Sequence, residues 1–163
     1  MKRATRQRVG MLAAAIALVA VATWQWQRDR DEAPGTLLTL PPSDVTQIEL
    51  RIGNGSTEHF TKRDGHWWRV DGAATRADDG RLAELADTAA ASVLSWRPLS
   101  DFQPARIGLA PPMSVLNLDG QQLEFGETSV TGPQRYVRVG DRVALVSVRY
   151  TPRPATQEAT KAR

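Results

Sequence analysis

The chain has 163 residues, of which 24% are charged and 41% are hydrophobic, and its formal net charge is +3. It contains no cysteine, which excludes disulfides, thiolate metal sites, a lipid-modified cysteine and a cysteine nucleophile. This length leaves room for one small domain beside the N-terminal apolar run.

The first feature in chain order is an uncharged, alanine-rich apolar run from Val9 to Trp26. Four cations precede it: Lys2, Arg3, Arg6 and Arg8. A helix over this run would be roughly 27 Å long, close to the roughly 30 Å of hydrocarbon in a bilayer. Cations resist translocation and indole rings favour the headgroup boundary. We therefore expect residues 1–26 to form a signal anchor in a bacterial inner membrane, with the N-terminus in the cytoplasm and the domain in the periplasm.

A cleaved signal peptide is the alternative interpretation of the same run. It would have a basic start, an apolar core to about Val19 and a small-x-small cleavage site at Ala20-Val21-Ala22, before Thr23. Both interpretations export the domain, and they differ only in whether the segment is retained.

The charge of the exported part differs from that of the whole chain. Without the four N-terminal cations, 17 Lys and Arg residues remain against 18 Asp and Glu residues. Nucleic-acid binding depends on clustered cations that displace phosphate counterions. We therefore expect no nucleic-acid partner.

Residues 27–43 are charged and then rich in Pro and Gly, which predicts a juxtamembrane linker. A domain is expected over residues 44–150. Its first strand is predicted from Val45 to Ile52, because Ile48 and Leu50 alternate with Glu49 and Arg51.

Three turn dipeptides predict three β-hairpins: Asp64-Gly65, Asp119-Gly120 and Gly140-Asp141. A two-residue turn at each dipeptide sets the pairing register. In that register Phe60 and Trp67 share one face of the first hairpin and Trp68 lies on the other. The second hairpin gathers four apolar residues on one face: Leu116, Leu118, Leu123 and Phe125. The third hairpin is apolar on both faces, with Val137, Val139, Ala144 and Val146 on one and Tyr136, Val143 and Leu145 on the other.

One helix is predicted between the hairpins. Asp78 or Asp79 can cap its start, and apolar residues recur at helical spacing from Leu82 to Val93 and Leu94. Residues 151–163 are polar and contain Pro152 and Pro154, which predicts a disordered tail. The expected fold is α+β: an N-terminal membrane helix, then a small antiparallel, hairpin-rich domain with one packed helix.

Several phrases in this order resemble the bacterial family named domain of unknown function 4340. They include Asp44-Val45-Thr46-Gln47, Lys62-Arg63-Asp64-Gly65, Ile107-Gly108-Leu109-Ala110-Pro111-Pro112, Leu123-Glu124-Phe125-Gly126 and Arg135-Tyr136-Val137. The resemblance spans roughly residues 36 to 150 and implies a membrane-anchored extracytoplasmic α+β domain. Longer members of the family occur with ABC-type transporter components. The family supplies no catalytic residues to transfer.

The sequence contains no catalytic, metal-binding or cofactor-binding motif, so we expect no catalytic residues, no metal site and no cofactor. His59 and His66 lie four strand residues apart in the hairpin, roughly 13 Å, which is too far for one zinc ion. The expected function is a non-enzymatic interaction or accessory module of an envelope or ABC-transporter-type complex, with Phe60 and Trp67 as an exposed partner contact. A periplasmic glycan-binding module using Trp67 and Trp96 is the alternative, and a hydrolase centred on His59 or His66 is a third.

Overall fold

The computed structural model describes residues 17–23 and 34–153. Residues 17–23 are helical, and within the described ranges no helix is both long enough and apolar enough to cross a membrane. The other residues of the expected anchor, and residues 154–163 of the expected tail, lie outside the described part of the chain.

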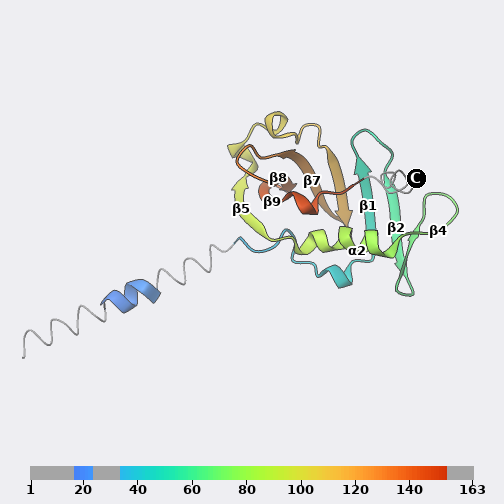
Figure 1. Ribbon diagram of the computed structural model, residues 1–163, viewed down its shortest axis with the longest axis horizontal. Helices are drawn as coiled ribbons and strands as arrows, with labels where there is room; N and C mark the ends of the chain where they lie inside the picture. The colour runs from blue at the N-terminus through green and yellow to red at the C-terminus, as the bar shows by residue number, and fades with distance from the viewer. Residues whose placement is uncertain (1–16, 24–33, 154–163) are drawn as a thin grey trace, which may run out of the picture. The chain divides into compact units, whose positions relative to one another are not determined.

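The domain is built on one fully antiparallel sheet of nine strands in the order β4-β3-β2-β1-β6-β7-β8-β9-β5 (Figure 1). Strands β1 to β4 form one meander, and strands β6 to β9 form a second. The two meanders are joined where β1 pairs with β6, and β5 lies at the far edge beside β9. The strands are β1 (Gln47–Ile52), β2 (Glu58–Arg63), β3 (His66–Arg69), β4 (Thr75–Arg76), β5 (Val93–Pro98), β6 (Ser114–Leu118), β7 (Gln121–Thr128), β8 (Gln134–Val139) and β9 (Arg142–Ser147). The predicted α+β, hairpin-rich architecture is confirmed.

All three predicted hairpin registers are confirmed. Arg63 pairs with His66, Leu118 with Gln121, and Val139 with Arg142. The Asp-Gly turns form because Asp64 and Asp119 adopt positive φ angles of 51° and 47°, which short polar side chains tolerate better than most.

The helix α2 (Asp79–Asp87) covers one face of the sheet and crosses its strands (Figure 1). Asp78 caps it by accepting a hydrogen bond from the backbone N–H of Arg81. Its apolar stripe is buried against the inner faces of the hairpins, where the largest fully buried side chains gather: Ile48, Leu50, Leu82, Leu116, Leu118, Leu123 and Phe125.

The helix ends earlier than the sequence pattern predicts. A short 3-10 turn, η2 (Thr88–Ala90), follows α2, and Val93 and Leu94 belong to the edge strand β5. The spacing of apolar residues alone could not distinguish helix from strand at Val93 and Leu94. The pairing of Val93 with Val146 places these residues in a strand although their spacing is also compatible with a helix. The remaining 3-10 turns are η1 (Pro42–Asp44), η3 (Leu99–Asp101), η4 (Pro104–Ile107) and η5 (Val148–Tyr150).

The predicted linker over residues 27–43 is wrong from Pro34 onward, because this segment is part of the domain. The backbone N–H of Leu37 donates to the carbonyl of Ala91 at 3.0 Å, and that of Leu38 to Ala89 at 2.9 Å. Both leucine side chains are buried in the core. Burial of these two leucines stabilises a segment whose composition resembles a linker.

The start of the predicted tail is also corrected. Pro152 is buried, and the carbonyl of Arg153 accepts a hydrogen bond from Arg81 of α2. Residues 151–153 therefore pack on the domain.

A second, smaller apolar cluster lies on the face of the sheet opposite α2, which we call the outer face. Here the connection from β5 to β6 packs against β8 and β9. The cluster contains buried Ile107, Leu109 and Val143, with Leu99, Phe102 and Tyr136 partly buried around them. The predicted burial of β8 and β9 on both sides is thus confirmed, and the outer-face contacts come from the residue 99–112 connection.

Candidate functional site

A pocket of about 240 Å³ opens on the outer face, beside the edge strand β5. Its lining residues come from β5, β8, β9 and the connection after β5: Ser95, Arg97, Asp101, Phe102, Tyr136, Val143 and Leu145.

Strand register explains how these side chains converge. Leu145 pairs with both Ser95 and Tyr136, and Val143 pairs with Arg97. Paired residues point to the same face of a sheet, so all five side chains face outward together. Phe102 closes one side by packing edge-on against Tyr136, with ring centroids 5.7 Å apart and planes at 65°. The pocket therefore has an apolar, aromatic floor.

The rim of the pocket is charged. The Arg97 guanidinium lies 3.7 Å from the Asp101 carboxylate, and the Arg97 side chain is 68% exposed. Arg142 does not belong to this rim, because it lies on the inner face of the sheet, where its guanidinium stacks over the Trp96 ring at 4.3 Å. An exposed ion pair of this kind contributes little to stability, so Arg97 can exchange its partner at low cost.

The size of the pocket limits what it can bind. Sites for drug-sized ligands and cofactors usually measure about 300 to 1,000 Å³. A pocket of about 240 Å³ instead suits one apolar side chain or a small fragment. The arrangement can therefore recognise an apolar group next to a group that pairs with arginine.

The expected exposed contact formed by Phe60 and Trp67 is wrong. Phe60 is 4% exposed and Trp67 is 3% exposed, and both belong to the core that α2 covers. The pairing predicted for them is correct, since Phe60 and Trp67 do share a face. The assignment of that face to solvent is the error. The next strand β1 presents Ile48 and Leu50 on the same face, which makes it the inner one.

The remaining tryptophans of the domain differ in their surroundings. Trp96 is half-buried, and its indole N–H donates to the carbonyl of Pro34 at 2.7 Å. Trp68 is half-buried on the outer face, with the Arg76 guanidinium 5.9 Å from its ring centroid. A glycan platform needs a bare ring face. Neither Trp67 nor Trp96 presents one, because Trp67 is buried and Arg142 covers Trp96.

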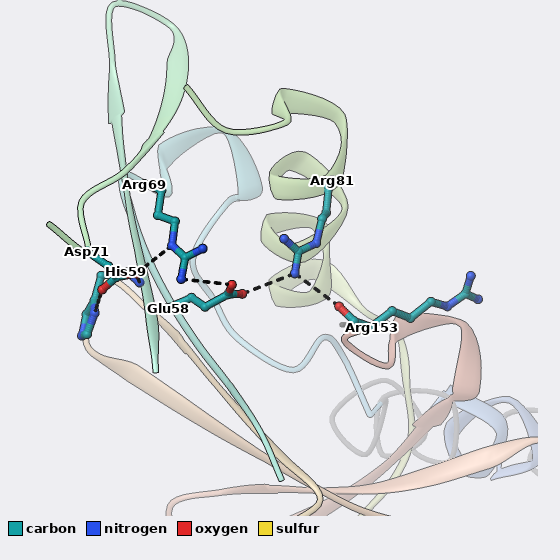
Figure 2. Close-up of polar contacts among 6 residues, drawn as sticks. All are labelled: Glu58, His59, Arg69, Asp71, Arg81 and Arg153. Carbon is teal, nitrogen blue, oxygen red and sulfur yellow. Dashed lines mark hydrogen bonds and ion pairs between the residues drawn. The ribbon is translucent and has the colours of Figure 1, made fainter. Parts of the chain in front are cut away.

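His59 belongs to a chain of polar contacts at the end of the β2–β3 hairpin (Figure 2). Its Nδ1 atom lies 2.7 Å from Oδ1 of Asp71, and its backbone N–H donates to Oδ2 at 2.9 Å. These two bonds, together with one from Arg69, lower the pKa of Asp71 to about 2. In the part of the chain that the structure describes, no hydroxyl group hydrogen-bonds to the His59 ring.

The network continues from the hairpin to the helix. Glu58 pairs with Arg69 at 3.4 Å and with Arg81 of α2 at 3.6 Å, and Arg81 also donates to the carbonyl of Arg153 (Figure 2). The contacts thus connect β2, β3, α2 and the last described residues. This geometry supports a structural role for the network.

His66 makes an analogous contact at the opposite end of the hairpin. Asp79 accepts the backbone N–H of Trp67 at 2.7 Å and pairs with Arg76 at 2.6 Å, and its Oδ2 lies 2.9 Å from Nδ1 of His66. The Trp67 N–H, followed by Arg76 and His66, holds the pKa of Asp79 well below its usual range. Asp78 therefore caps the helix, while Asp79 ties the helix start to the hairpin.

No cluster of three His, Asp or Glu residues that could hold a metal ion occurs within residues 17–23 and 34–153. The residues that form the pocket were not identified as a site from the sequence. The apolar outer-facing positions of β8 and β9 were a usable signal for Tyr136, Val143 and Leu145, whereas Phe102 and Arg97 are brought there by the path of the connecting chain.

Comparisons of the chain with protein-family models, with curated proteins and with solved structures found no match. The pocket and its surroundings are therefore the starting point for a function.

Proposed function

We propose that this chain is a single-pass, membrane-anchored periplasmic protein whose domain acts as a non-enzymatic interaction module of an envelope or transporter-type complex. The apolar run from Val9 to Trp26 and its basic flank support the anchor and the export of the domain. Retention of this run distinguishes the anchor from the cleaved-signal alternative.

The observation that carries the interaction role is the outer-face pocket beside β5. It combines an aromatic floor of Phe102 and Tyr136 with the exposed Arg97 at its rim. Protein interfaces concentrate binding energy in such aromatic and arginine positions, each fitted to a pocket on one partner. The pocket replaces the Phe60 and Trp67 surface as the proposed contact, while burial of Trp67 leaves the glycan-binding alternative without its main residue.

Site-specific photo-crosslinking in cells tests the interaction role. A p-benzoylphenylalanine placed at Arg97 is expected to give a discrete crosslinked protein adduct. The same residue placed at Gln122, which is exposed on the outer face of β7, serves as the matched control and is expected to give none. Absence of an adduct from position 97, or identical adducts from both positions, would remove the proposal.

N-terminal sequencing of the protein recovered from cells tests the anchor. A mature protein that retains the residues before Thr23 and resists carbonate extraction is the expected result. A mature N-terminus at Thr23 would show that the segment is a cleaved signal and would overturn the anchored form of the proposal.

A further inference from the structure

The chain enters the domain beside the strand that lines the outer-face pocket. The backbone N–H of Val93 donates to the carbonyl of Gly35 at 3.0 Å, and the indole N–H of Trp96 donates to the carbonyl of Pro34 at 2.7 Å. Both acceptors belong to the first described residues of the domain, and both donors belong to β5. These contacts tie the start of the domain to β5.

The pocket adjoins this junction. Trp96 lies between Ser95 and Arg97 in β5, and both of these neighbours line the pocket. The Trp96 side chain points to the inner face of the sheet, and its two neighbours point to the outer face. The strand that forms one wall of the pocket is therefore held to Pro34 through Trp96.

The length of chain before Pro34 limits how far the pocket can lie from an anchor. Eight residue steps separate Trp26, the last residue of the apolar run, from Pro34. An extended chain gains at most about 3.6 Å per residue, so these steps span no more than about 29 Å in any conformation. With the run retained in a bilayer, this wall of the pocket stays within roughly one bilayer thickness of the membrane surface.

The lining of the pocket selects an apolar occupant. Its volume of about 240 Å³ is filled by one side chain, and its floor is formed by aromatic and aliphatic residues of β8, β9 and the connection after β5. The two charged residues at its rim, Arg97 and Asp101, pair with each other at 3.7 Å, so the rim as a whole is neutral. An apolar side chain therefore gains most from entering the pocket.

We infer that the pocket binds an apolar side chain from the juxtamembrane segment of an integral membrane protein. This inference rests on the proposed function and names the kind of partner. The short connection confines the pocket to the layer next to the bilayer, where a partner anchored in the same bilayer presents its juxtamembrane residues. Confinement of both proteins raises their effective concentration, which lets a contact as small as this pocket be occupied. The partner supplies a leucine or phenylalanine that packs on Phe102 and Tyr136.

Photo-crosslinking of the full chain in its native membrane tests the kind of partner. With p-benzoylphenylalanine at Arg97, mass spectrometry of the adduct is expected to identify a protein whose uncrosslinked form stays in the membrane pellet after carbonate washing. A partner that carbonate releases would overturn this inference and leave the interaction role standing. Absence of any adduct would instead remove the interaction role, and this inference with it.

Two insertions between Glu32 and Ala33 test the confinement. A Glu-Ala-Ala-Ala-Lys repeat of about 40 residues forms a semi-rigid spacer, roughly 60 Å long where it is helical, and is expected to lower the adduct yield by about tenfold or more. A Gly-Ser repeat of the same length is the matched control, because a flexible chain lets the pocket return to the bilayer. It is expected to retain most of the adduct, and equal yields from the two insertions would overturn the inference.

Filling the pocket tests where the partner side chain lies. Ser95→Phe is expected to remove the adduct from position 97, and the smaller Ser95→Leu is expected to act in the same direction. Gln122→Phe, on the exposed outer face of β7, is the matched control and is expected to leave the adduct unchanged. Urea unfolding midpoints close to that of the parent show that the variants keep the fold. An adduct that persists in a folded Ser95 variant would contradict insertion into the pocket.

Discussion

The backbone carbonyl of Ile107 passes directly over Gly126, so close that a Cβ added at residue 126 would lie 2.2 Å from the Ile107 oxygen. The connection between β5 and β6 lies against β7 at this point. At the neighbouring Gly108, which has a φ of +67°, an added Cβ would lie 2.8 Å from the backbone nitrogen of Glu127. Glycine at both positions permits the close packing that holds the outer-face cluster in place.

Gly126→Ala is therefore expected to lower the free energy of unfolding by roughly 1 to 3 kcal/mol, because backbone must move to admit the methyl group. Urea unfolding of the full chain in mild detergent, followed by tryptophan fluorescence, measures the effect. Gly132→Ala is the control, since the nearest atom to its added Cβ is 3.9 Å away. Equal unfolding midpoints for the two variants would refute the packing argument.

The two Asp-Gly turns predict different costs for the same substitution. The Asp119 carboxylate accepts the backbone N–H groups of Thr46 and Gln47 at 3.0 and 2.8 Å, and so joins the second meander to the start of β1. The Asp64 side chain makes no hydrogen bond or ion pair within the described residues. Asp119→Ala is expected to cost roughly 1 to 3 kcal/mol more than Asp64→Ala, because it leaves two donors without their charged acceptor. Comparable thermal unfolding of the two variants would contradict this.

The tryptophan pair in β3 gives a direct test of which side chain is buried. Trp67→Ala removes a core side chain and is expected to cost roughly 3 to 5 kcal/mol. Trp68→Ala removes a half-buried ring on the outer face and is expected to cost markedly less. Urea midpoints for both variants decide the order, and the reverse order would show that the faces of the hairpin are exchanged.

Asp71 makes stability depend on acid pH. Its pKa is lowered from 3.8 to about 2, chiefly by the backbone N–H and the ring of His59. A lowered carboxylate pKa stabilises the fold above the unfolded-state value, and this contribution is lost as pH falls from about 4 through about 2. Asp71→Asn is expected to be less stable than the parent by roughly 1 kcal/mol at pH 7.

That difference should shrink toward zero as the pH falls to 2, which unfolding curves at several pH values can measure. Asp141→Asn is the control, because no hydrogen bond or ion pair of the Asp141 side chain occurs in the described part of the chain. A gap that stays constant with pH would show that Asp71 acts through its shape and not through its charge.

The turn dipeptides and the alternation of apolar residues predicted the strand pairing within each hairpin correctly. They did not predict where the folded domain begins and ends. The Asp119-Gly120 turn sets its register by itself, since a two-residue turn leaves one arrangement that gathers Leu116 and Leu123. The order of the hairpins in the sheet, in contrast, is not set by residues close together in the sequence. It depends on β1 pairing with β6 and β5 with β9, and nothing local to either strand specifies these contacts.

The same distinction explains the error at Phe60 and Trp67. Their hairpin has apolar residues on both faces, so alternation could not say which face is inner. That choice is made by the neighbouring strand and by α2, which are distant in sequence. The pocket was missed for a similar reason, because Phe102 reaches it through an irregular connection that has no period to detect.

The pairing of Ile48 with Leu118 has a consequence for how the chain acquires its structure. The first meander is complete at Arg76, but the strand that covers the open edge of β1 begins only at Ser114. Pairing across such a separation is slow, because the entropy of the intervening chain is lost before the contact between the two strands can stabilise the fold. During synthesis the backbone edge of β1 therefore stays unpaired until β6 emerges, and this interval is when the chain is most exposed to aggregation.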